Sequence, residues 1–136
     1  TGDIELRRNL SCQDGAVGPP EHISYTFNAR LMHIEQTDSR GFKVQRDVTL
    51  GPDILSRGAV PLMWDVDGAE AAIRGVSPHW SAPALDSTLL YAKDRLWFPG
   101  ARHSGQSSVA LIDGSVHTGA SPDQNPGWRW SFQPRP

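Results

Sequence analysis

One short stretch, SSVALIDGSVHTG at residues 107–119, constrains the fold of this chain more than any other feature. Asp113 and Gly114 separate two runs of β-prone residues, and Asp-Gly between such runs is the strongest short-range signal of a β-hairpin. We predict a type I′ turn at Asp113-Gly114, because both central positions of that turn need positive φ. The stretch therefore predicts two short strands joined by a tight turn.

The rest of the chain also favours strands over helices. No segment has a sustained 3.6-residue apolar period. The 13 glycines and 11 prolines among 136 residues interrupt regular structure often. The fold class that follows is mainly β, or α+β if an N-terminal helix is present, with an antiparallel sheet and long loops. Its length fits a single domain over 1–136, divided into a lead-in segment and loop (1–22) and a β-rich body (23–136).

Particular segments carry this expectation. Residues 22–34 contain alternating apolar and aromatic side chains, and residues 59–66 are a candidate for a buried strand. Residues 51–58 are expected to form a short helix with Asp53 near its start. Near the C-terminus, residues 128–132 alternate Trp, Trp and Phe, which would share one face of a further strand.

Composition excludes several classes of partner. The net charge is −2, and acidic and basic residues are interspersed, so no basic surface favours nucleic acid. No apolar stretch is long enough for a membrane span in this chain. The one cysteine, Cys12, cannot form an internal disulfide or a multi-cysteine zinc site. It is either a buried free thiol or a thiol that pairs with another chain.

His103 and Asp113 allow two interpretations. As a catalytic pair they would have to converge, yet an extended segment would separate their side chains by roughly 20 to 30 Å. The neighbouring serines have no G-x-S-x-G elbow around them. The alternative is structural: Asp113-Gly114 forms the turn, and His103 bonds a backbone group or a carboxylate to hold the loop that leads into the hairpin. The structural reading is the one we expect, and a hydrolase remains open to geometry.

A second candidate site is the sequence WDVDGAE. Asp65, Asp67 and Glu70 resemble the alternating carboxylates of a calcium loop, since calcium takes several oxygen ligands. The full EF-hand spacing is absent, and Asp65 and Asp67 would point to one face if the strand continued. The alternative is a strand end followed by a turn. No other cofactor is expected.

Five tryptophans are candidate binding or interface residues. They could stack on carbohydrate, and more often such residues are core or interface anchors in a small β domain. The candidates are Trp64, Trp80, Trp97, Trp128 and Trp130.

The residues around His103 resemble a known family signature. RHSGQSSVALIDGSVH is similar to the end of the prepilin-processing-associated C-terminal domain family, defined by a histidine, nine residues and Asp-Gly. Here these are His103, Asp113 and Gly114, without a gap. Arg102, Gly105 and the apolar run before Asp113 also fit.

Upstream residues add to this resemblance. Family members commonly show a cysteine near a loop and then a Ser-Tyr-x-x-Asn stretch, which corresponds here to Cys12 and to Ser24, Tyr25 and Asn28. The apolar PLMWD strand and the terminal GWRW also match. The resemblance spans residues 9–132.

The resemblance implies a pilin-like globular domain that is exported to the bacterial surface and is not an enzyme. Its implied role is a structural subunit or decoration of a type IV pilus-like filament or a type II secretion-like pseudopilus. Its implied partners are other pilin-like subunits. The N-terminal apolar helix of such proteins is missing here, so it was either removed or is supplied by a separate chain. The alternative is an extracellular binding module for carbohydrate or calcium.

Overall fold

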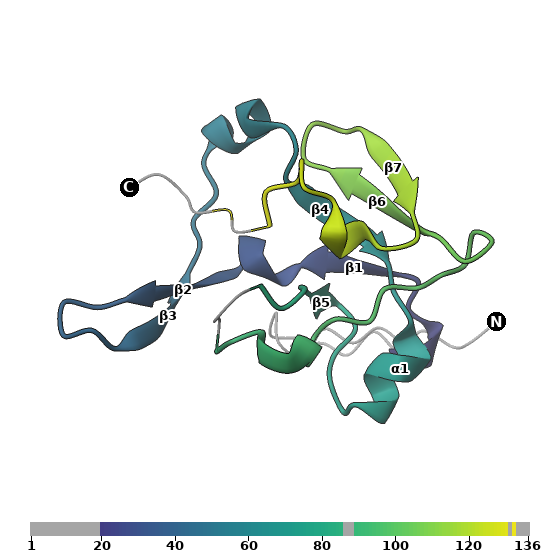
Figure 1. Cartoon of the computed structure of the whole chain (residues 1–136), viewed down its shortest axis with the longest axis horizontal. Coiled ribbons are helices and arrows are strands. Elements are labelled where there is room, and N and C mark those ends of the chain that lie inside the picture. The colour runs from purple at the N-terminus through teal and green to yellow at the C-terminus, as the bar shows by residue number, and fades with distance from the viewer. Residues whose placement is uncertain (1–19, 86–88, 131, 133–136) are drawn as a thin grey trace, which may run out of the picture.

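The structure, a computed structural model, describes residues 20–85, 89–130 and 132 (Figure 1). These residues form seven strands, one short α-helix and several 3-10 helices. The elements are β1 (Tyr25–Asn28), β2 (His33–Thr37), β3 (Lys43–Asp47), β4 (Pro61–Asp65), α1 (Gly68–Ile73), β5 (Trp80–Ser81), β6 (Ser107–Leu111) and β7 (Val116–Gly119). The predicted mainly β fold is therefore confirmed.

Five of the strands form one sheet in the order β5-β1-β4-β6-β7, and β2 and β3 form a separate two-stranded ribbon. Every neighbouring pair is antiparallel except β1 and β5, which run parallel. The main sheet is thus mixed, where the sequence predicted an antiparallel one. The exception is short: it joins Phe27 to Trp80 and Asn28 to Ser81.

The predicted hairpin is confirmed as β6–β7, but its predicted type I′ turn is wrong. Only Gly114 has positive φ, at 87°, and Asp113 does not. The N–H of Gly114 donates to Leu111 O, and the N–H of Leu111 donates to Ser115 O. This is the three-residue loop in which an ordinary turn is followed by a left-handed glycine. The carboxylate of Asp113 accepts the N–H of Ser115 across this turn.

Other local predictions divide in the same way. The strand predicted at 59–66 is confirmed by β4, and the predicted short helix is a 3-10 helix at Pro52–Arg57. The strand predicted at 22–34 is confirmed only in part, because β1 ends at Asn28 and a 3-10 helix at Ala29–Leu31 separates it from β2. The predicted strand at 128–132 is wrong, since no strand occurs among residues 121–130. Those residues instead form turns, and their aromatic rings pack without a strand ladder.

One apolar cluster of the core is formed by residues of β4, β6 and the C-terminal segment. Trp64 and Trp130 are buried there together with Val109 and Leu111. The Trp64 and Trp130 rings meet edge to face at 5.1 Å, an arrangement that aromatic pairs prefer. This packing holds the C-terminal segment against the sheet.

The first 19 residues, with Cys12 and the predicted lead-in segment, lie outside the described residues. Within the described part of the chain, no helix is both long enough and apolar enough to cross a membrane.

Candidate functional site

The loop that carries His103 is closed by a tight turn before β6. Backbone hydrogen bonds join His103 N to Gln106 O at 3.2 Å and Gln106 N to His103 O at 3.1 Å. The two residues between them, Ser104 and Gly105, both have positive φ, at 54° and 81°. This is the type I′ pattern that the sequence predicted at Asp113-Gly114. The turn presents the His103 side chain toward the end of β4.

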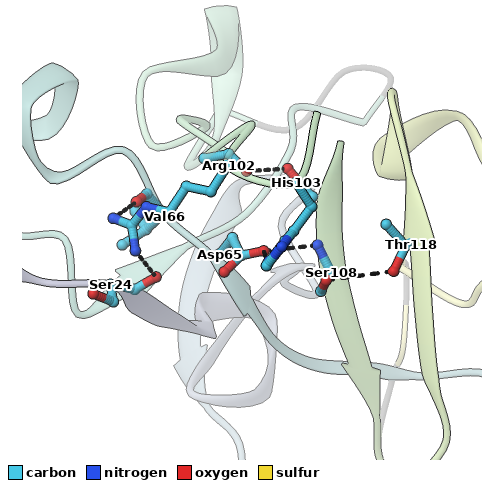
Figure 2. A network of polar contacts seen from close by, with 9 residues as sticks. Ser24, Asp65, Val66, Arg102, His103, Ser108 and Thr118 are labelled. Atoms are coloured by element: carbon cyan, nitrogen blue, oxygen red, sulfur yellow. Dashed lines mark hydrogen bonds and ion pairs between the residues drawn. The ribbon is translucent and has the colours of Figure 1, made fainter. Parts of the chain in front are cut away.

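The partner of the His103 imidazole is the carboxylate of Asp65, the last residue of β4 (Figure 2). Its carboxylate is 2% exposed, and Oδ2 lies 3.2 Å from His103 Nε2. The same oxygen accepts the backbone N–H of Ser108 at 2.8 Å. A buried carboxylate is costly without such partners. The imidazole and one strand amide therefore hold the charge of Asp65 inside the fold.

Arg102 fixes the other side of the same loop. Its guanidinium donates to three backbone carbonyls, of Ser24 and Ile23 at 3.3 Å each and of Val66 at 2.8 Å. Figure 2 shows the side chain reaching the Ser24 and Val66 carbonyls. The rigid guanidinium fork suits several acceptors at once. Arg102 thus joins the loop to the start of β1 and the end of β4.

Gly100 brings the loop close to β4. Its N–H donates to Asp65 O at 2.8 Å, and its carbonyl accepts from Ser107 Oγ at 2.5 Å. A Cβ at this position would lie 2.8 Å from Val66 O. Only glycine allows this approach of two backbones.

His103 and Asp113 do not form a pair. The described partner of Asp113 is Ser115, which donates through its N–H at 2.9 Å and its Oγ at 2.7 Å. The Ser115 hydroxyl and N–H lower the pKa of the exposed Asp113 carboxyl, with a smaller contribution from His117. Asp113 is therefore a turn residue, and the carboxylate at His103 is Asp65. Sequence reasoning missed this pair because nothing in the local pattern links the end of one strand to a distant loop.

The nearby serines use their hydroxyls elsewhere. Ser107 Oγ donates to the Gly100 carbonyl, and Ser108 Oγ lies 3.4 Å from Thr118 Oγ1 on β7. The first contact joins β6 to the preceding loop, and the second joins β6 to β7. The arrangement around His103 is an imidazole–carboxylate pair that connects two elements.

The three predicted calcium ligands have separate partners. Asp67 Oδ1 accepts Glu70 N at 3.0 Å and caps α1, and Glu70 Oε1 pairs with Arg74 Nε at 2.7 Å. Asp65 faces His103. β4 ends at Asp65, so the expected shared face with Asp67 is not formed. No group of three metal-binding side chains occurs in the described ranges. The structure therefore does not bring these carboxylates together.

The Ser-Tyr-x-x-Asn residues tie β1 to β4. Asn28 is buried, donates Nδ2 to Pro61 O at 2.8 Å and accepts Arg30 N at 3.0 Å. Ser24 O accepts Val66 N at 3.0 Å. Tyr25 is exposed and pairs across the sheet with Asp65. These residues position the strand that faces the His103 loop.

The tryptophans separate into two groups. Trp64 and Trp130 are 1% and 3% exposed, so they are core residues, which is one of the alternatives that the sequence left open. They pack against each other and against Val109 and Leu111. Trp97 and Trp128 are partly buried against the same cluster. Trp80 lies apart from them, on the edge strand β5.

Trp80 lines an apolar groove that the sequence did not predict. The groove has a volume of about 900 Å³. Its apolar lining includes Phe27, Leu31, Met32, Val48, Leu50 and Trp80. β1 creates it by an unexpected orientation: Thr26 and Asn28 are buried, whereas Phe27 is 45% exposed. At the edge of the groove, His33 Nδ1 lies 2.8 Å from Asp47 Oδ1.

Comparisons with known proteins do not assign this arrangement to a family. No family model, no curated protein and no solved structure matches the chain. The pilin-like resemblance therefore stays a prediction that depends on the residues quoted above.

Proposed function

We propose that this chain is a non-enzymatic, pilin-like globular domain. In this role it is a structural subunit or decoration of a type IV pilus-like extracellular filament or a type II secretion-like pseudopilus. The observation that carries the proposal is the use of the signature segment: Arg102 and His103 hold a loop, and Asp113 and Gly114 form a turn. Because the residues of the signature stabilise the fold, they are consistent with a structural protein that acts by packing against other subunits.

The surface available for packing supports this proposal. Phe27 and Leu50 are 45% and 44% exposed, and both line the apolar groove. An amphipathic helix binds such a groove through its apolar face. We assign the groove to the helical core of the filament, supplied by a separate chain or by a segment of this protein outside the described residues. The partners are then pilin-like subunits at the bacterial surface.

Immunoelectron microscopy of native material tests this role. An antibody against this chain should label filaments at regular intervals, and antibody preincubated with the purified protein should remove the label. Protein found only in soluble or envelope fractions, with unlabelled filaments, would contradict the filament subunit. Co-purification with a secretion assembly would then separate a pseudopilin from a free module.

A surface variant tests the groove. Leu50→Asp places a charge in the apolar lining and should prevent incorporation into filaments. Ile73→Asp is the matched control, because Ile73 is an apolar residue of α1 that is 82% exposed and is not part of the groove lining. Both variants should keep the wild-type melting temperature. Equal incorporation of the two would remove the groove from the assembly.

The same groove favours a second candidate, a carbohydrate-binding module. The Phe27 and Trp80 rings lie 5.7 Å apart and both line the groove, so aromatic faces are available there for a sugar ring to stack on. Titration with soluble oligosaccharides should then change tryptophan fluorescence in the wild type and not in Trp80→Ala.

Calcium binding, the other ligand of the binding-module alternative, is tested by thermal melting with added calcium and with a chelator. A higher melting temperature with calcium than with the chelator is the supporting result.

A further inference from the structure

The outer edge of the β2–β3 ribbon carries an inference that does not depend on the proposed function. The ribbon projects from the body of the protein (Figure 1). The ladder contains only β2 and β3, so the far edge of β3 has no strand neighbour within the described ranges. Four of the five β3 residues are exposed. An edge of this kind is a template for pairing with another chain.

The register shows which backbone groups face outward. At the two ends of the ribbon, Val48 N donates to Met32 O and Asp38 N donates to Phe42 O, each at 2.8 Å. Hydrogen-bonded pairs alternate along an antiparallel ladder. The even-numbered residues of β3 therefore bond β2, and the odd-numbered ones direct their N–H and C=O groups away from it. The outward residues are Lys43, Gln45 and Asp47.

These three residues are self-complementary. If a second copy runs antiparallel about a two-fold axis at Gln45, Lys43 of each copy lies opposite Asp47 of the other. Each facing pair can exchange two backbone hydrogen bonds. Asp47 is 89% exposed beside His33, and Lys43 keeps 35% exposure while pairing with Glu35 at 3.0 Å. Opposite charges at facing positions stabilise a strand pair, and like charges destabilise it.

The other face of the strand adds apolar contact. In the same register, Phe42 lies opposite Val48 of the second copy. Phe42 is 65% exposed in the single chain, at the tip of the ribbon. Pairing would cover this ring, which no packing within the described chain buries.

We propose that two copies of this chain associate through antiparallel pairing of their β3 strands, with Lys43 of each copy against Asp47 of the other. Charged residues on a strand edge usually prevent pairing. Here a positive and a negative residue lie at equal distances on either side of Gln45, so a two-fold axis matches them. The result is a continuous four-stranded sheet across two ribbons.

Charge exchange tests the register. Lys43→Glu and Asp47→Lys each place like charges at both facing positions, so each should raise the dimer dissociation constant about tenfold or more. A mixture of the two variants restores opposite charges at both positions, so it should form a heterodimer that a tag on one chain recovers. Sedimentation velocity over a dilution series measures all three. Monomeric wild type at every concentration, or a mixture that does not associate, would overturn the proposal.

A backbone variant tests the hydrogen bonds. Gln45→Pro removes an outward N–H at the centre of the proposed pairing and leaves every bond to β2 in place. It should abolish the dimer, whereas Gln45→Ala, which keeps the N–H, should not. Thermal melting confirms that both variants fold. A dimer that survives Gln45→Pro would place the contact elsewhere on the molecule.

Discussion

Replacing His103 with alanine tests the central feature of the site. His103 Nε2 lies 3.2 Å from Asp65 Oδ2, and the only other hydrogen bond described at that carboxylate comes from Ser108 N. The variant leaves a nearly fully buried charge with one partner fewer. Because Asp65 is the last residue of β4, the variant should weaken the contact between the end of this strand and the loop that carries His103.

The expected cost is about 1 to 2 kcal/mol. Removing one partner of a fully buried ion pair costs about 3 to 5 kcal/mol. His103 is 57% exposed, so water can replace much of its contribution, and exposed pairs contribute about 1 kcal/mol or less. The value lies between these limits. For a domain of this length it corresponds to a fall in melting temperature of about 3 to 8 °C.

Urea unfolding followed by tryptophan fluorescence measures this cost, since the buried Trp64 reports the core. His22→Ala is the matched control, because this histidine is exposed and should change stability by less than about 0.5 kcal/mol. In an Asp65→Asn background the buried charge is absent, so His103→Ala should cost about 1 kcal/mol less than in the wild type. An unchanged midpoint in His103→Ala, or an equal loss in both backgrounds, would refute the reasoning.

Three further predictions concern the supporting contacts. Gly100→Ala should lose about 1 to 3 kcal/mol in urea unfolding, because its Cβ would contact backbone atoms at under 3 Å, whereas Gly119→Ala has open space and should be neutral. Asn28→Ala should lose about 2 kcal/mol by the same assay, because it removes two buried hydrogen bonds. Burial raises the pKa of Glu35, but the Lys43 hydrogen bond and two backbone N–H groups outweigh it and lower the pKa below its ordinary 4.5. The wild type should therefore be more stable than Glu35→Gln by about 1 kcal/mol or less. This difference in the free energy of unfolding should be complete above pH 4.5 and should disappear as the pH falls through the lowered pKa of Glu35, which urea unfolding at a series of pH values measures.

These predictions separate a structural site from a catalytic one. If the pair of His103 and Asp65 serves stability, its variants change unfolding and assembly together. Asp113 does not pair with His103, because its carboxylate accepts from the N–H and the hydroxyl of Ser115 within the hairpin. The loop of His103 and the turn of Asp113 therefore stabilise two different parts of the fold.

The tertiary structure decided which residues meet. Local patterns cannot reveal that Asp65 faces His103, because the contact depends on β4 lying beside β6 in the sheet. The same applies to the groove: alternation predicted β1, but its apolar face is outward because the buried positions hold Thr26 and the hydrogen-bonded Asn28. A pattern of period two gives two faces and does not say which one the core takes.

The sequence by itself determined the local elements. The absence of helical periodicity, the frequent glycines and prolines, and the Asp113-Gly114 turn were enough for a mainly β chain with the β6–β7 hairpin. These features act over a few residues through allowed backbone angles and side-chain alternation. Long-range packing decided the rest: the parallel pairing of β5, the burial of Trp64 and Trp130, and the buried carboxylate of Asp65. Such contacts depend on the whole sheet, because each is stabilised only by residues that the chain brings together when it folds.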